Sequence, residues 1–527
     1  MTAWFCLRVS KVKMHRPVVM GARGMVATGH PLASDAALDV LKAGGNAFDA
    51  ALCASGVLSV VKSYHCGLGG DLFGIFYSAN QGKLLVLNGS GRAPKKIRRE
   101  LLSEGIPHRG ILAASTPGTV DGWVELAARL GTRTMAEVLE PAIHYADNGF
   151  PVFPHLANVI RASEKTLGAD PTWSRIFLQH GKVPDLGDLF VQKDLAATLR
   201  AIANSGREAF YSGDTASFIV RASKRYGGCF SLEDFAAHRS RWEEPLSTSY
   251  REYEICVPPP NSFGLLLLLQ LKYLAEYDLT KFGHNTAKYV SLLVRAKEEA
   301  WRAGRFWIAD PDQHQREKVR EFLVRFPREI TANGTVAEAN HGSSTTYVAA
   351  ADKFGNWASL IQSVHQSFGC GIVVDGTGIV LNNRMAGFNL ISGHPNQLAP
   401  GRLPAHTLSP ALILKGGKPT AAIGTPGGFG QTQFLAQTLC NLFDFNMNIQ
   451  EAIEAPRWQS EQAGEVELED RFSEAVAKQL TQDGYDVKIR GSWEFAFGGV
   501  EAVFMPPNQS VLMGAADPRR EGYAVGH

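Results

Sequence analysis

The amino-acid sequence predicts an α/β fold in which two β-sheets are stacked and helices cover their outer faces. Three observations predict it: a nearly all-apolar helical segment at 47–60, mostly helical spacing over about 115–340, and a change to strands and hairpins from residue 345 onward. A helix that is apolar on every side must be buried, which packing against a sheet achieves. Two sheets between helices therefore account for one large domain of 527 residues.

The elements before residue 100 follow from apolar spacing and turn residues. The segment 32–41 has an apolar helical face and stops at Gly44-Gly45, because glycine ends helices readily. The segment 47–60 forms a second helix. Two strands and the turn between them are expected next, at 72–77, 84–87 and Asn80-Gln81-Gly82.

Helical spacing dominates the middle of the chain, and hairpins follow it. The expected helices lie at 119–130, 135–148, 190–205, 264–277 and 286–304. Two hairpins are expected, the first with strands at 347–351 and 357–363, the second with strands at 411–414 and 420–423. No internal repeat divides the chain, so the elements are expected to form one domain.

Composition and charge exclude several classes of protein. The formal net charge of +2 gives no electrostatic basis for binding nucleic acid or an anionic membrane. No apolar run approaches the roughly 18–20 residues of a membrane span. The seven cysteines are scattered without a Cys-x-x-Cys pair, so we expect thiols in a reducing compartment and no zinc site. The first residues lack the features of a signal peptide, which predicts a cytoplasmic location.

Thr345 is the first candidate catalytic residue. The stretch Ser343-Ser344-Thr345-Thr346 stands directly before a hairpin, deep inside the chain. A Thr at the start of a strand can attack the peptide bond before it and become a new N-terminus, with its freed α-amine as its own base. Because Thr is also common in strands, the same residues alone fit an ordinary strand.

A glycine-rich turn follows a later strand and strengthens the catalytic interpretation. Gly427 and Gly428 lie in Gly424-Thr425-Pro426-Gly427-Gly428-Phe429-Gly430. Two successive glycines can direct two backbone N–H groups at one point, as an oxyanion hole requires. A plain turn before a helix, or an anion site at a helix N-terminus, fits the same residues.

Several ordered motifs resemble the γ-glutamyltransferase (glutathione hydrolase) family. They lie at 29–34, 43–50, 67–71, 258–260, 345–346, 378–383, 408–410, 426–428 and 517–520. The resemblance implies an αββα sandwich of the N-terminal nucleophile hydrolase type. It also implies cleavage between Ser344 and Thr345 into a large subunit, 1–344, and a small subunit, 345–527. The two fragments are expected to stay together as a heterodimer, which could pair into a dimer of these.

The resemblance also assigns catalytic roles. It implies that Thr345 is the nucleophile in both self-cleavage and turnover, and that Ser363 hydrogen-bonds it where the family usually has a Thr. Gly427 and Gly428 would supply the oxyanion N–H groups. No metal and no organic cofactor is expected.

The substrate pocket departs from the family pattern at the groups that hold an amino acid. The family uses an Arg for the α-carboxylate, and that position falls on Ser90, with Arg92 two residues further on. The family Asp that pairs the α-amine falls on Gly387. A buried ammonium without a partner costs several kcal/mol. A γ-glutamyl amine should therefore bind poorly.

Other pocket positions become basic. Arg384 stands where the family usually has Gln, His365 replaces an Asn, and His406-Thr407 replaces a Ser-Ser pair. Singly, each fits a surface Arg or a hydrogen-bonded core His. As a set at family binding positions they favour an anionic head group, because the planar fork of Arg matches a carboxylate.

The sequence thus predicts an amidohydrolase that acts on a small anionic amide through an acyl-enzyme. Some family members hydrolyse cephalosporin side chains or, in bacterial purine catabolism, oxamate. Oxamate, giving oxalate and ammonia, is the best single candidate. Glutathione or γ-glutamyl hydrolysis or transfer is the alternative, and a non-catalytic binding protein of the same fold is a further one. A serine hydrolase is disfavoured, since Gly-x-Ser-x-Gly does not occur.

Overall fold

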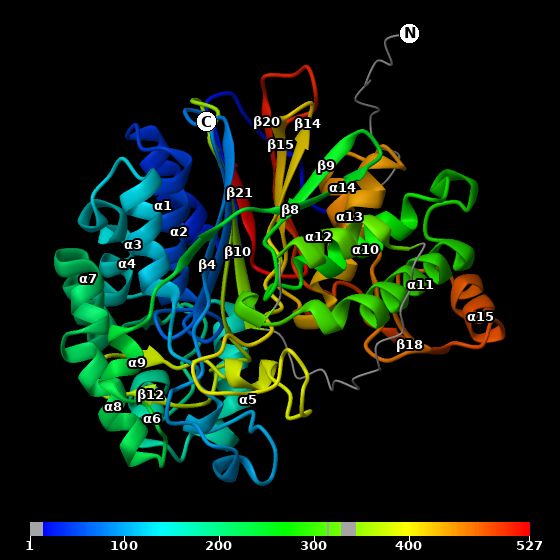
Figure 1. Cartoon of the computed structure of the whole chain (residues 1–527). Helices are drawn as coiled ribbons and strands as arrows, with labels where there is room; N and C mark the ends of the chain where they lie inside the picture. Colours follow the sequence, from blue (N-terminus) through cyan, green and yellow to red (C-terminus); the bar gives the residue numbers. More distant parts are fainter. Residues whose placement is uncertain (1–13, 314–315, 328–343) are drawn as a thin grey trace.

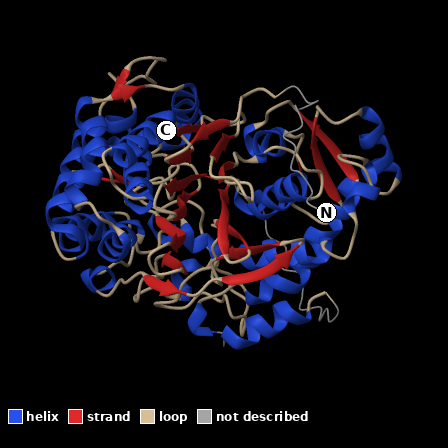
Figure 2. Cartoon of the chain, turned by 90° about the horizontal axis from the view of Figure 1, so that it is seen from above, coloured by secondary structure: helices blue, strands red, loops and turns tan. Residues whose placement is uncertain are grey.

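Two seven-stranded antiparallel sheets lie face to face at the centre of the molecule, with helices on both outer sides (Figure 1, Figure 2). The computed structural model describes residues 14–313, 316–327 and 344–527. The residues before 14, which include Cys6, lie outside these ranges, and so does Ser343. This four-layer arrangement is the αββα sandwich that the sequence predicted.

The first sheet contains the strand that begins at Ser344. Its order is β21 (Tyr523–Gly526), β2 (Gly24–Thr28), β10 (Ser344–Asp352), β11 (Trp357–His365), β3 (Asp71–Ser78), β4 (Lys83–Gly89) and β7 (Arg241–Glu243). The order of the second sheet is β1 (Val19–Gly21), β20 (Leu512–Ala516), β19 (Glu501–Phe504), β15 (Lys418–Gly424), β14 (Ala411–Lys415), β9 (Tyr253–Val257) and β8 (Leu246–Tyr250).

Helices cover each sheet on its outer side (Figure 1). α1 (Pro31–Lys42), α2 (Ala47–Val61) and α3 (Thr119–Leu130) pack on the first sheet. Further helices pack outside these: α4 (Met135–Asn148) on α2, α7 (Lys193–Tyr211) on α3 and α4, and α8 (Asp214–Arg225) and α9 (Leu232–Ala236) on α7, with α5 (Pro154–Leu167) next to α6 (Pro171–Phe177). α10 (Gly264–Leu274), α13 (Gln431–Phe443) and α14 (Ile449–Glu454) pack on the second sheet. α11 (Ala287–Gly304) and α12 (Arg316–Arg325) pack on α10, and α15 (Glu474–Gln482) packs on α11. Among the described residues, none of the helices has the length and apolar character to cross a membrane.

Shorter strands form three small sheets outside this sandwich. They are β5 (Phe150–Pro151) with β6 (Leu189–Phe190), β12 (Val373–Val374) with β13 (Ile379–Val380), and β16 (Trp458–Gln459) with β17 (Glu465–Glu469) and β18 (Asp486–Arg490).

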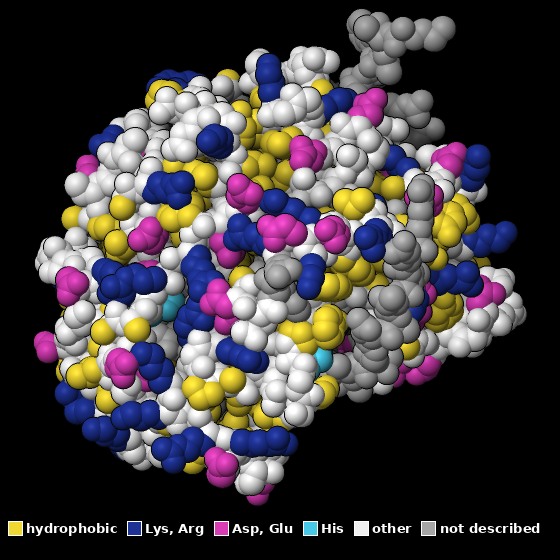
Figure 3. Space-filling view, viewed as in Figure 1, with side chains coloured by type: hydrophobic (Ala, Val, Ile, Leu, Met, Phe, Trp, Pro, Cys, Tyr) yellow, Lys and Arg dark blue, Asp and Glu magenta, His cyan; other side chains and the backbone are white. Residues whose placement is uncertain are grey.

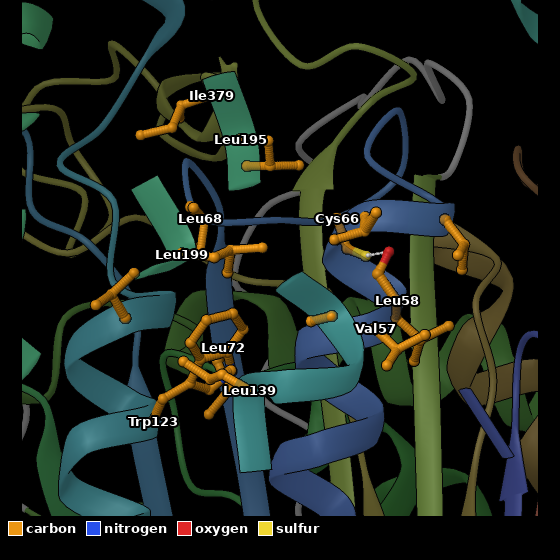
Figure 4. Packing of buried hydrophobic residues seen from close by; sticks show 14 of the residues in the cluster. Val57, Leu58, Cys66, Leu68, Leu72, Trp123, Leu139, Leu195, Leu199 and Ile379 are labelled. Carbon is orange, nitrogen blue, oxygen red and sulfur yellow. Dashed lines mark hydrogen bonds between the residues drawn. The ribbon is translucent and has the colours of Figure 1, made fainter. Parts of the chain in front are cut away.

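The alternation of side chains along β10 separates two cores. Tyr347, Ala349 and Ala351 pack in the core between the sheets, whereas Val348 and Ala350 join the core beneath the helices. All 15 residues of α2 are buried there, which confirms the predicted buried helix. Figure 4 shows part of this helix-covered core, with residues of α2 beside Leu72, Trp123 and Leu139. By the same alternation, Thr345 lies on the face between the sheets.

Most predicted elements are confirmed, and three strands of the two large sheets, in the middle of the chain, were not predicted. The helical pair at the N-terminus and both hairpins stand within a few residues of their predicted bounds. The middle of the chain, expected to be mostly helical, also contains β7, β8 and β9. The tight turn between β8 and β9 has Arg251 at φ 57°, in the left-handed region. Since no glycine or asparagine marks that turn, the hairpin left no turn signal in the sequence.

The mixture of charges on the surface and the free cysteines agree with the sequence composition. Acidic and basic side chains lie among one another across the middle of the face in Figure 3. The six cysteines of the described part are all free, and five of them are buried, which confirms the expectation of thiols for these six.

Candidate active site

The site begins where β10 pairs with β11. Thr345 lies directly opposite Ser363, and both side chains point between the sheets. The Thr345 hydroxyl donates to Ser363 Oγ at 3.2 Å. Ser363 Oγ also accepts the His365 N–H at 2.7 Å and donates its own proton to the carbonyl oxygen of Ser344. One hydroxyl therefore contacts both the candidate nucleophile and the carbonyl of the peptide bond that would be cleaved.

The backbone is irregular at this bond. The register of β10 against β11 shifts between Ser344 and Thr345. Such bulges bend a strand and redirect its side chains, and they are frequent next to active sites. Upstream, Ser344 Oγ lies 2.8 Å from Ser367 Oγ, and Arg109 donates to the Ser367 carbonyl at 2.8 Å. These contacts anchor Ser344 while the Ser363 hydroxyl polarises its carbonyl group.

The turn with Gly427 and Gly428 approaches from the second sheet. Their φ angles of 139° and 53° lie in the left-handed region, which favours glycine. β15 ends at Gly424, where an added Cβ would stand 2.2 Å from the Tyr347 ring. The two strands therefore meet two residues from Thr345. Among the described residues neither the Gly427 nor the Gly428 N–H donates a hydrogen bond, so both can bind an oxyanion.

A buried charged cluster lies at the start of β3. Asp71 Oδ1 accepts the Gly91 N–H at 2.9 Å, and Asp71 Oδ2 lies 3.1 Å from His406 Nε2 and 3.5 Å from Arg384 Nε. Asp71, Arg384 and His406 are at most 1% exposed. Burial raises the pKa of Asp71 to about 6, against the opposing effect of the Arg384 charge. Asp71 is a candidate site residue that the sequence analysis did not name, although it ends the motif at 67–71.

Arg384 is incompletely satisfied in this cluster. Burial lowers its pKa to about 10 although the Asp71 carboxylate opposes the shift. Its Nη1 reaches Thr407 Oγ1 at 3.5 Å, and within the described part of the chain Nε and Nη2 make no hydrogen bond. A buried guanidinium with unused donors is costly unless another acceptor binds it.

The two histidines are held neutral. Burial and the Arg384 charge keep the pKa of His406 well below its usual range, and the same two causes lower the pKa of His365. His365 Nδ1 lies 3.2 Å from the Asn383 carbonyl, so it carries the proton of the neutral ring and leaves Nε2 as an acceptor. The structure thus brings Arg384, His406 and Thr407 together, with His365 beside Ser363.

Ser90 and Arg92 are engaged elsewhere. Ser90 Oγ donates to Asn88 Oδ1 at 2.7 Å and accepts from Asn261 Nδ2 at 3.2 Å. The Arg92 guanidinium is 31% exposed and pairs with two carboxylates and a carbonyl group, those of Asp310, Asp312 and Gly401. Neither side chain contacts the Arg384 cluster in these hydrogen bonds and ion pairs.

There is no room for a side chain at Gly387, the position on which the family Asp that pairs a substrate amine falls. At Gly387 an added Cβ would lie 2.4 Å from the carbonyl oxygen of Ala405. A carboxylate side chain cannot stand there without a backbone shift. No group of three or more His, Cys, Asp or Glu side chains is placed to hold a metal in the ranges that the structure describes.

Comparisons with known proteins agree over nearly the whole chain. The family model described as Gamma-glutamyltranspeptidase matches residues 33–527. The glutathione hydrolase-like YwrD proenzyme of Bacillus subtilis (strain 168) is 38% identical and covers 96% of this chain and 99% of that protein. The oxamate amidohydrolase proenzyme of Klebsiella pneumoniae (strain ATCC 700721 / MGH 78578) is 32% identical over 96% of this chain and 99% of its own length. The crystal structure of cephalosporin acylase from Bacillus halodurans aligns with a TM-score of 0.90 and 35% identity, over 99% of this chain and 98% of that chain.

Thr345→Ala is expected to stay at full length and inactive, because the hydroxyl that attacks the Ser344 carbonyl is gone. A denaturing gel and an amide hydrolysis assay measure this. Thr346→Ala is the matched control, since the Thr346 side chain lies against Gly29 on the opposite face of β10. Efficient cleavage of Thr345→Ala would remove Thr345 from the nucleophile role.

Ser363→Ala is expected to slow self-cleavage about 10²-fold, the cost of removing one donor from a developing oxyanion. Ser363→Thr keeps the hydroxyl and should retain most of the rate. The fraction of cleaved chain against time measures both. Equal rates for Ser363→Ala and the parent would show that the bond to the Ser344 carbonyl plays no part in cleavage.

Proposed function

This chain belongs to the gamma-glutamyltranspeptidase family, whose proenzymes are self-processed N-terminal nucleophile hydrolases that act on amide bonds, and we propose that it hydrolyses amides whose acyl group carries a carboxylate and no amine. The observation that carries this proposal is Arg384. Its guanidinium is 1% exposed; among the described residues its Nη2 makes no hydrogen bond, and its Nε faces Asp71 Oδ2 only at the long distance of 3.5 Å. A substrate carboxylate would satisfy these donors with two parallel hydrogen bonds.

The lack of room for a side chain at Gly387 supports a substrate whose acyl group has no amine. A γ-glutamyl substrate brings an ammonium next to its carboxylate, and that ammonium needs a buried acceptor. Both Asp71 oxygens already have partners, the Gly91 N–H and the His406 ring. An amino-acid head would therefore lose hydration without a matching partner, which disfavours glutathione hydrolysis or transfer.

The catalytic steps follow from the groups around Thr345. Self-cleavage would free the Thr345 α-amine, whose ordinary pKa of about 7.7–8 suits a general base near neutral pH. The amine takes the proton of Oγ1 as Oγ1 bonds to the amide carbon, and the carbonyl oxygen becomes an oxyanion facing Gly427 and Gly428. The proton then passes to the leaving nitrogen as the C–N bond breaks. Water hydrolyses the remaining ester by the same base.

Oxamate is the proposed substrate because it is a small amide with a carboxylate beside its carbonyl group. The similar oxamate amidohydrolase proenzyme supports it. A longer carboxylate-bearing acyl group is the second candidate, favoured by the likeness to a cephalosporin acylase along the whole chain. We propose two associated fragments, 1–344 and 345–527, in the cytoplasm, which the free cysteines support.

The test is ammonia release by the processed protein from oxamate and glutamine, with glutamate release from glutathione measured beside it. Ammonia from oxamate alone is the expected result. Glutamate from glutathione at a comparable rate would mean that another group accepts the α-amine, and the proposed acyl class would be wrong.

Arg384→Ala is expected to raise KM for an anionic amide about 10- to 100-fold, the usual effect of losing a charged hydrogen bond. Neutral amides should change little. Arg384→Lys keeps a positive charge without the planar fork, so its KM for the anionic amide should lie between those of the parent and Arg384→Ala. Equal effects on anionic and neutral amides would exclude Arg384 from carboxylate binding.

The pH dependence of KM should report Asp71. With its pKa raised to about 6, Asp71 takes up a proton as the pH falls through this value, and the protonated acid no longer competes with the substrate carboxylate for Arg384. KM for an anionic amide should therefore fall as pH is lowered through this range, and Asp71→Asn should remove the dependence. The Thr345 α-amine also takes up a proton as the pH falls, and its protonation should lower kcat. Measuring kcat separately from KM distinguishes that effect from the one at Asp71. A KM that does not change with pH in the parent would contradict the coupling.

A further inference from the structure

One face of α11 carries a basic and aromatic stripe that the proposed reaction does not use. Lys297 and Trp301 of α11 and Arg305, which directly follows its last residue, recur at four-residue spacing, so they lie on one side. Lys297 Nζ stands 5.5 Å from the centroid of the Trp301 ring, and Arg305 Cζ stands 5.5 Å from it. Trp301 therefore lies next to two cations.

Two further rings close this stripe into a corner. The ring centroids of Phe263 and Phe429 are 5.7 and 5.3 Å from that of Trp301, and 5.8 Å from each other. Arg305 Cζ lies 4.5 Å over the Phe263 ring. Phe263, Trp301, Arg305 and Phe429 are called the aromatic corner below.

The aromatic corner is joined to the candidate active site at two points. Phe429 directly follows Gly428 in the oxyanion turn. The Phe263 N–H donates to the His406 carbonyl at 2.8 Å, and His406 belongs to the buried cluster with Arg384. The aromatic corner is thus linked to the candidate active site by the chain at Gly428 and by one backbone hydrogen bond at His406.

Exposure separates the two ends of the site. Asp71, Arg384 and His406 are sealed, so the carboxylate end of the acyl group would be enclosed. Trp301, Arg305 and Phe429 are partly exposed. The part of an amide on the other side of its carbonyl group would extend toward solvent, and the aromatic corner is partly exposed and adjoins the glycine turn in the chain.

We infer that the aromatic corner is a subsite for the leaving amine, and that it takes a planar aromatic amine bearing a carboxylate. This inference rests on the proposed amide hydrolysis. Offset rings stack on Trp301 and Phe429, and the guanidinium of Arg305 attracts the carboxylate. The reaction stays balanced: the C–N bond breaks, and the aniline nitrogen takes the proton that the Thr345 amine removed from Oγ1.

The test compares three amides with one acyl group. Oxamate releases ammonia, N-phenyl oxamate releases aniline, and N-(4-carboxyphenyl) oxamate releases 4-aminobenzoate. The processed parent enzyme is expected to have its lowest KM for the carboxyphenyl amide. In Trp301→Ala, the ratio of the KM for the carboxyphenyl amide to the KM for oxamate should rise about tenfold, the size of one lost aromatic contact. Arg305→Gln should reduce the preference for carboxyphenyl over phenyl.

Trp307→Ala is the matched control. Trp307 is also partly exposed and near the end of α11, but it stacks on Phe322 at 5.3 Å. The KM ratio should not change in this variant. If Trp301→Ala does not self-cleave, Trp301→Leu takes its place, because it keeps apolar volume and loses the ring. An unchanged ratio in a self-cleaved Trp301 variant, or equal changes in Trp301 and Trp307 variants, would overturn the inference.

Binding of free 4-aminobenzoate separates this inference from the proposed function. Titration calorimetry with the processed protein is expected to detect binding that Trp301→Ala weakens about tenfold and Trp307→Ala leaves unchanged. Such binding without hydrolysis of any oxamate would leave the subsite standing and refute the proposed acyl group. Hydrolysis of oxamate without any preference for aryl amides, and without 4-aminobenzoate binding, would refute the subsite alone.

Discussion

The pairing of β10 with β11 is the constraint on which the site depends. It places Ser363 opposite Thr345, so that one hydroxyl bonds the Thr345 oxygen and the Ser344 carbonyl together. A hydroxyl has one proton and two lone pairs, and all three are used here, since the His365 N–H is bound as well. The candidate nucleophile is thereby oriented by backbone pairing between two buried strands, which are far stiffer than a loop.

The second constraint is the cost of burying charge. Arg384 is buried beside Asp71, whose carboxylate lies 3.5 Å away and is the one carboxylate paired with it among the described residues, and Asp71 itself is shared with His406 and the Gly91 N–H. A buried cation with one partner at that distance is only partly compensated. Under the proposed function this imbalance is the source of specificity, because an anion of suitable shape would relieve it.

The sequence predicted much of the fold and part of the site, for identifiable reasons. α2 and the hairpin of β10 and β11 were found because their apolar periods and turn residues are local signals. β8 and β9 were missed because Arg251 turns the chain without a turn residue. Asp71 was not predicted because no local sequence signal indicates that Arg384, more than 300 positions away, lies beside it. The aromatic corner was missed for the same reason.

The sequence by itself determined the residues with local chemistry: a Thr at the start of a strand, a Gly-Gly turn after another strand, and an ordered series of family motifs. Only the tertiary structure decided which charges meet. Asp71, Arg384 and His406 come from a strand, a short helical turn and a loop that are distant in the chain. Electrostatic energy depends on distance and burial, which the chain acquires only when the two sheets close on each other.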